Sequence, residues 1–105
     1  MIIVETSVFT KQVQNFLTDD EYRKLQTLLV NRPNSAPIIK GSGGLRKIRW
    51  LVRGKGKRGG VRVIYYWAVE EDKLLMLFIY TKTRTSDLTP SQLKVLREIV
   101  KEEYP

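Results

Sequence analysis

The segment LRKIRWLVRGKGKRGGVRVIYYWAV, residues 45–69, holds two alternating runs separated by a basic, glycine-rich stretch. In the first run, residues 45–52, Lys47 and Arg49 share one face with position 51, and positions 48, 50 and 52 share the other. In the second run, residues 61–69, Arg62 shares a face with positions 64 and 66. Alternation with a period of two is typical of half-buried strands. The segment therefore predicts a β-hairpin whose loop is the basic stretch between the runs.

The sequence on either side extends this hairpin into a larger fold. A polar turn at 70–73 leads to a third strand at 74–82, which makes an antiparallel meander. The other predicted elements are a short strand at 2–4, a helix at 7–17, a helix opened by a T-x-x-E capping box at 18–21 and ending near 31, and a C-terminal helix opened by a second cap at 89–92. The order predicts an α+β fold, with a meander sheet, two N-terminal helices and one C-terminal helix.

Composition limits the classes of site. A chain of 105 residues with 42% hydrophobic residues suits one domain, 1–105, with one core. Without Cys there is no disulfide or thiolate zinc site, and without His the usual metal ligand and general base are missing. We therefore expect no metal and no cofactor. The start of the chain does not resemble a signal peptide and no apolar run could span a bilayer, so a cytoplasmic protein is expected.

The distribution of charge predicts a polyanionic partner. The net charge is +8, and no acidic residue occurs between Glu21 and Glu70. That stretch holds 12 of the 19 Lys and Arg residues. Such a surface attracts phosphate, which makes nucleic acid the first partner to consider.

The strand cations also suit RNA cleavage without histidine. If the hairpin is roughly symmetric about its loop, Arg62 lies near Lys47 and Arg49, and Lys82 ends the third strand. Attack by a ribose 2′-hydroxyl needs a base, a cationic cradle for the phosphorane and an acid for the leaving oxygen. A lysine crowded by other cations can act as the base, and arginines can form the cradle. Tyr66, on the face of Arg62, could position the nucleotide.

Simpler interpretations remain open at this point. The basic loop could be a solvated loop or a passive phosphate contact. Tyr65, Trp67 and Trp50, on the face opposite Arg62, fit a hydrophobic core better than a base-stacking surface. Tyr66 fits either environment.

Three motifs resemble one family. GGLRKIR at 43–49, GKGKRGG at 54–60 with VRVIYY at 61–66, and IYTK at 79–82 with SDLT at 86–89 are similar to the RelE/HigB-like toxins of bacterial type II toxin–antitoxin systems, and nearest to the HigB-type branch. The resemblance implies a compact sheet flanked by helices. It also implies a metal-independent endoribonuclease that cuts mRNA on the ribosome and inhibits translation.

The resemblance also assigns residues. It implies catalytic roles for Lys47, Arg49, Arg62 and Lys82. It implies RNA or ribosome contacts for Arg46, Arg53, Lys55, Lys57, Arg58, Tyr66 and Arg84. In two places the chain departs from the family pattern. Tyr104 lies beyond the last helix and does not match the C-terminal catalytic tyrosine of some members, and a second arginine of the better-known branch falls at Thr83.

The partners implied by the resemblance are a cognate HigA-like, helix-turn-helix antitoxin, the ribosome and its mRNA. Operator DNA would be bound only through the antitoxin complex, and no membrane is involved. Two other functions stay open: a non-catalytic RNA- or DNA-binding module, and an inactive toxin relic that acts through a complex with its antitoxin.

Overall fold

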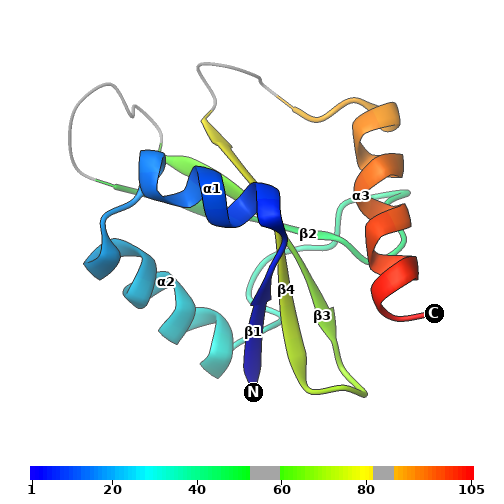
Figure 1. The fold of residues 1–105 in the computed structure, drawn as a ribbon, viewed down its shortest axis with the longest axis horizontal. Coiled ribbons are helices and arrows are strands. Elements are labelled where there is room, and N and C mark those ends of the chain that lie inside the picture. Colours follow the sequence, from blue (N-terminus) through cyan, green and yellow to red (C-terminus); the bar gives the residue numbers. More distant parts are fainter. Residues whose placement is uncertain (53–59, 82–86) are drawn as a thin grey trace.

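The computed structural model describes residues 1–52, 60–81 and 87–105. A sheet lies between two helices on one face and one helix on the other (Figure 1). The elements are β1 (Ile2–Glu5), α1 (Ser7–Phe16), α2 (Asp19–Asn31), β2 (Arg46–Trp50), β3 (Val61–Ala68), β4 (Lys73–Thr81) and α3 (Pro90–Glu103). The α+β class and the positions of all three helices are as the sequence predicts. In the described part of the chain, no helix has the length and apolar character needed to cross a membrane.

The four strands form one mixed sheet in the order β1-β4-β3-β2. Strands β2, β3 and β4 pair antiparallel, which confirms the meander. The meander is only part of the sheet, because β1 pairs parallel to β4, with Ile3 opposite Leu74. The sequence analysis assigned β1 no partner. A pairing between segments so far apart in the chain leaves no local pattern, whereas a hairpin does.

Hydrophobic clusters lie on both faces of the sheet. Towards α1 and α2, the largest side chains that are fully buried are Phe9, Leu25, Leu29, Tyr65, Leu74 and Met76. Towards α3, the buried residues are Leu45, Ile64, Leu75, Leu77, Tyr80, Leu96 and Val100. Successive residues of β3 therefore belong to different clusters, as alternation requires. We call the second side of the sheet the α3 face.

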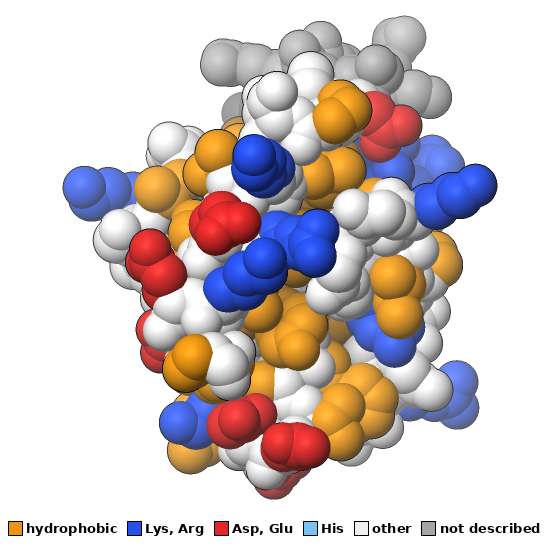
Figure 2. All heavy atoms as spheres, turned by 90° about the vertical axis from the view of Figure 1, so that its right-hand side faces the viewer, with side chains coloured by type: hydrophobic (Ala, Val, Ile, Leu, Met, Phe, Trp, Pro, Cys, Tyr) orange, Lys and Arg blue, Asp and Glu red, His pale blue; other side chains and the backbone are white. Residues whose placement is uncertain are grey.

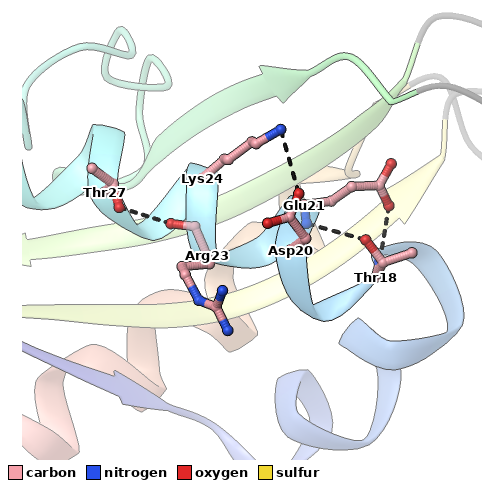
Figure 3. Close-up of polar contacts among 6 residues, drawn as sticks. All are labelled: Thr18, Asp20, Glu21, Arg23, Lys24 and Thr27. Carbon is pink, nitrogen blue, oxygen red and sulfur yellow. Dashed lines mark hydrogen bonds and ion pairs between the residues drawn. The ribbon is translucent and has the colours of Figure 1, made fainter.

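Both predicted capping boxes are present. At the start of α2, the Thr18 hydroxyl accepts a hydrogen bond from the Glu21 amide at 3.1 Å, and the Glu21 carboxylate accepts one from the Thr18 amide at 2.8 Å (Figure 3). Thr89 and Gln92 repeat this arrangement at the start of α3. These bonds satisfy amides that the first turn of a helix leaves without partners. The cap at Thr89 fixes where α3 begins.

Candidate nucleic-acid interface

Two arginines lie side by side in the middle of the antiparallel hairpin. Arg49 of β2 is the register partner of Arg62 of β3. Directly opposite residues in such a pair have Cα atoms about 4.5–5.5 Å apart, and their side chains leave the sheet on the same face. The predicted proximity of these two cations is therefore confirmed. Arg49 is exposed, whereas Arg62 is only 8% exposed.

This pair can bind an anion that has two or more oxygens. Arginine guanidinium groups are cations, and each carries donors in a planar fork that matches a phosphate. Arg62 is held by the sheet on both sides, because it is opposite Arg49 on β2 and Tyr80 on β4. A buried, positioned arginine loses little further freedom when it binds, so this part of the α3 face is preorganised for an oxyanion.

Lys47 lies two residues before Arg49 on the same face, and it has a partner that the sequence analysis missed. Its Nζ atom donates a hydrogen bond to Oδ1 of Asp87 at 2.8 Å. The hydrogen bond and the charge of Lys47 hold the pKa of Asp87 below its ordinary value, and Arg62 adds to this effect. The stretch without acidic residues thus folds next to a carboxylate from 40 residues away. The sequence analysis expected Lys47 to be surrounded by other cations. That expectation is wrong, because Lys47 is paired with the Asp87 carboxylate.

A small cavity lies beside these residues. It has a volume of about 190 Å³ and is lined by Ile39, Lys47, Ile64, Tyr80, Asp87, Leu88 and Leu93. The Tyr80 hydroxyl is buried and has no hydrogen-bond partner among the described residues. Burial raises the pKa of this hydroxyl, although the nearby charge of Lys47 opposes the rise. Tyr80 is therefore protonated at neutral pH and can both donate and accept a hydrogen bond.

Arg46 lies away from the other predicted site residues. Its register partner is Tyr65, whose side chain belongs to the cluster under α1 and α2, so Arg46 is on the face opposite the arginine pair. Its Nη1 atom donates a hydrogen bond to the Ala36 carbonyl at 2.6 Å. The contact ties the segment between α2 and β2 to the sheet, so the structure places Arg46 in a structural position.

Tyr66 is on the α3 face but not beside the arginines. It lies four residues beyond Arg62 on β3, roughly 13 Å further along the strand. Its ring is stacked on Tyr104, with the ring centroids 6.2 Å apart. It is half-buried and packs against the cluster under α3. Tyr66 therefore helps to hold the end of α3 against the sheet, and the structure does not bring it to the arginine pair.

The aromatic residues predicted for the core are there. Tyr65 is fully buried and its hydroxyl donates a hydrogen bond to the Pro33 carbonyl at 2.7 Å. Trp50 and Trp67 are partly buried and pack against the same cluster. Tyr65 is therefore unavailable as a platform for a nucleobase, and the packing of Trp50 and Trp67 against the core agrees with the simpler interpretation of these residues.

Six of the predicted site residues lie outside the described part of the chain. These are Arg53, Lys55, Lys57, Arg58, Lys82 and Arg84. Among the described residues that flank these segments, Val61 and Thr81 are register partners. Over residues 1–52, 60–81 and 87–105, no group of three His, Cys, Asp or Glu side chains is arranged to hold a metal ion.

A larger cavity, of about 600 Å³, lies elsewhere on the molecule and has a different character. It lies between α3 and the segment that joins β1 to α1, and its lining includes Val4, Val8, Leu77, Phe78, Val95 and Ile99. It contains none of the predicted site residues. Size alone would select this cavity as the site, but it lacks the cations that the chemistry needs. We therefore place the candidate site at the smaller cavity and the arginine pair.

The surface on the α3 side carries charges of both signs. Figure 2 shows basic side chains gathered across the middle of this side, apolar side chains between them, and acidic side chains mainly along one margin and at the bottom. A polyanion that approaches this side meets cations together with apolar contact area.

Comparison with known proteins identifies the fold. The sequence matches no protein-family model. The structure is similar to a substituted form of the Escherichia coli toxin RelE in the free state, with a TM-score of 0.58 and 17% identity over 81% of this chain and 86% of that chain. It is also similar to a chain of the intact Escherichia coli RelBE toxin–antitoxin complex, with a TM-score of 0.59 and 15% identity over 76% of this chain and 94% of that one. The chain therefore has the RelE-like toxin fold.

Proposed function

We propose that this protein is the toxin of a type II toxin–antitoxin system and that it cuts mRNA on the ribosome. The observation that carries the proposal is the register pairing of Arg49 with Arg62 on the α3 face, beside Lys47. The RelE-like fold supports the same function, because the similar proteins are a toxin and a toxin–antitoxin complex. The net charge of +8 supports a polyanionic substrate.

The proposed reaction is transesterification within the RNA. The 2′-oxygen of one ribose attacks the neighbouring phosphorus while its proton passes to a base. The bond from phosphorus to the 5′-oxygen breaks, and an acid supplies a proton to that oxygen. The products are a 2′,3′-cyclic phosphate and a 5′-hydroxyl. Arg49 and Arg62 would hold the non-bridging oxygens, whose negative charge is greatest in the phosphorane.

Lys47 and Lys82 remain the candidates for proton transfer, and their roles stay unassigned. In the free protein Lys47 is engaged with Asp87. The side chains of Lys47 and Asp87 are 36% and 72% exposed. Ion pairs that are open to solvent contribute little free energy, so an RNA phosphate can compete with Asp87 for the ammonium group. Binding of substrate would then release Lys47 beside the scissile phosphate.

The proposed partner is an antitoxin. A similar structure is a toxin–antitoxin complex, which is the basis for this part of the proposal. The proposed antitoxin is HigA-like, contains a helix-turn-helix and alone supplies the contacts to operator DNA. Binding of such an antitoxin would keep the toxin inactive in the cell. Co-expression with the product of the adjacent gene tests this part: the two proteins should co-purify, and the antitoxin should restore growth.

The function is tested by inducing the protein in a bacterium and mapping the 5′ ends of its mRNA. We expect growth arrest and new ends in phase with codons, only within translated regions. Arg62→Lys should remove both effects. Lys24→Ala is the matched control, because Lys24 is an exposed cation on α2, on the other side of the sheet. Continued translation without codon-phased ends, or full toxicity of Arg62→Lys, would contradict the proposal.

One observation favours a second function, that of a module that binds RNA without cutting it. Lys47 already donates a hydrogen bond to a carboxylate. A lysine in this state is better suited to binding phosphate than to acting as a general base. Binding of this kind should weaken steeply as salt rises. Tight, salt-dependent binding to ribosomes with intact mRNA would support this alternative.

A further inference from the structure

We propose that the small cavity lined by Lys47, Tyr80 and Asp87 is a nucleobase-binding pocket that holds a base next to the phosphate on Arg49 and Arg62. The inference rests on the proposed function, since it names how the same site would recognise its RNA. It also makes a claim of its own, namely that the site distinguishes bases that carry an exocyclic amino group from uracil.

The first argument is the unpaired hydroxyl of Tyr80. This side chain is 4% exposed, and its hydroxyl lacks a hydrogen-bond partner among the described residues. Leaving a buried hydroxyl unpaired is costly, so proteins rarely do it without a reason. The hydroxyl belongs to a residue that lines the cavity and that lies close to the charges of Lys47 and Asp87. A ligand that enters the cavity and displaces the side chains covering the hydroxyl would supply the missing partner.

The second argument is the shape and lining of the cavity. A volume of about 190 Å³ is below the range of roughly 300–1,000 Å³ that is typical of sites for larger ligands. Its walls are the aliphatic side chains of Ile39, Ile64, Leu88 and Leu93. Aliphatic walls suit the faces of a flat, uncharged ring and do not suit a phosphate. RNA-binding proteins hold unstacked bases in this way, by contact with the ring faces and hydrogen bonds to the edges.

The third argument is position. Ile64 and Lys47 are register partners, and the next pair on the same face is Arg62 and Arg49. Tyr80 is opposite Arg62 on β4. The cavity and the arginine pair are therefore adjacent on the same three strands. A nucleotide whose phosphate lies on the arginines would have its base within reach of the cavity.

The polar groups of the cavity indicate which bases it prefers. The Asp87 carboxylate is an acceptor, and its lowered pKa keeps it ionised. Exocyclic amino groups of adenine, cytosine and guanine are donors that suit this carboxylate, whereas uracil carries carbonyl oxygens in their place and its one edge donor is the ring N3–H between them. Lys47 and the Tyr80 hydroxyl can donate to ring nitrogens or carbonyl oxygens. We therefore expect uracil to bind most weakly.

The test is a titration of the full chain with the four nucleoside 3′-monophosphates and, separately, with inorganic phosphate. Methyl resonances of Ile39, Ile64, Leu88 and Leu93 are followed by NMR. The nucleotides should shift these resonances and phosphate should not, and the uridine nucleotide should bind about 3- to 10-fold more weakly than the other three, as expected for one lost hydrogen bond. If phosphate gives the same shifts, or if all four nucleotides bind equally, the pocket is excluded.

Two variants separate binding from structure. Tyr80→Phe should weaken the nucleotides about 3- to 10-fold without lowering the melting temperature, because it removes a buried hydroxyl that has no partner. Tyr104→Phe is the matched control, since its hydroxyl is also buried and unpaired but lies at the far end of α3. The Tyr104→Phe variant should bind the nucleotides as tightly as the unchanged protein does. Unaltered nucleotide affinity in Tyr80→Phe would overturn the inference.

These results do not depend on cleavage. If the protein binds bases selectively but cuts no mRNA, the proposal of a nucleobase pocket is supported and the proposal of a nuclease is contradicted. If the protein cuts mRNA but binds all four nucleotides equally, and Tyr80→Phe binds them with unchanged affinity, the nuclease is supported and the nucleobase pocket is contradicted.

Discussion

Arg49 and Arg62 are register partners on β2 and β3, and both side chains lie on the face of the sheet that α3 covers in part. Arg62 is buried between Arg49 and Tyr80 of the flanking strands. Arg62, which is held between the flanking strands, and the exposed Arg49 at the adjacent position form a site for an oxyanion, in which Arg62 keeps its position before substrate arrives.

Replacing either arginine with lysine should nearly abolish cleavage although the charge is kept. Lysine lacks the planar fork that binds two oxygens at once. Loss of one such donor group should reduce the rate of cleavage of ribosome-bound mRNA by about 10²-fold. Single-turnover rates of Arg49→Lys and Arg62→Lys give the effect, with Lys24→Ala as a control that should retain its rate. A loss of less than threefold in both lysine variants would show that the arginine pair only attracts RNA.

The ion pair between Lys47 and Asp87 should be visible in an acid titration. Because the folded pKa of Asp87 is depressed, its contribution to stability is present above the unfolded pKa and is lost as pH falls through the folded pKa. The carboxyl carbon of Asp87, followed by NMR, should therefore titrate below the ordinary value. In Lys47→Met the midpoint should rise, whereas in Lys24→Met it should not. Equal midpoints in the unchanged protein and Lys47→Met would mean that the pair does not form in solution.

The capping box of α2 permits a matched test of stability. The Thr18 hydroxyl caps the helix, whereas the Thr27 hydroxyl bonds back to the Arg23 carbonyl in the middle of the same helix (Figure 3). Thr18→Ala should lower the free energy of unfolding by about 1 kcal/mol. Thr27→Ala should leave it unchanged or raise it slightly, because alanine favours the helix interior. Urea unfolding measures both, and equal losses would refute the assigned role of the cap.

Gly60 is expected to be required for the position of Arg62. Its φ is +76°, and a Cβ atom there would lie 2.2 Å from the Trp50 carbonyl oxygen. Gly41 has nearly the same φ, +74°, but open space around it. Gly41→Ala should cost about 1–2 kcal/mol for the left-handed backbone alone. Gly60→Ala should cost more and should also reduce cleavage, since the hairpin must shift two residues before Arg62.

Unfolding curves and single-turnover rates of the two alanine variants make this comparison. If Gly60→Ala were no less stable and no less active than Gly41→Ala, the close approach of Gly60 to Trp50 would not be a constraint on the site.

The alternating pattern of the hairpin was sufficient to predict the central part of the site. Period-two alternation defined the two faces of β2 and β3, and near symmetry about the loop placed Arg62 near Lys47 and Arg49. The structure makes Arg49 the register partner of Arg62. The same logic failed for Arg46, because nothing in the sequence showed that a neighbouring loop would present the Ala36 carbonyl to it. It also left Tyr66 undecided until the stacking with Tyr104 was seen.

Contacts between distant segments were beyond the reach of the sequence. Asp87 contacts Lys47 although 40 residues separate them in the sequence. Likewise β1, at the start of the chain, pairs with β4, the last strand of the meander. Neither contact has a local signature, since each depends on how α3 and β1 pack after the sheet forms. The unpaired state of the Tyr80 hydroxyl is likewise a property of the packed fold. The assignment to the HigB-type branch and the roles of Lys82 and the basic loop remain predictions.

The most direct test of the proposed chemistry uses ribosomes that hold an mRNA with a single 2′-deoxynucleotide at the scissile position. We expect rapid cleavage of the all-ribose mRNA, products with a 2′,3′-cyclic phosphate and a 5′-hydroxyl, and no cleavage at the substituted position. Cleavage of the 2′-deoxy mRNA at an equal rate would contradict the proposed chemistry, because the attacking oxygen would then come from elsewhere.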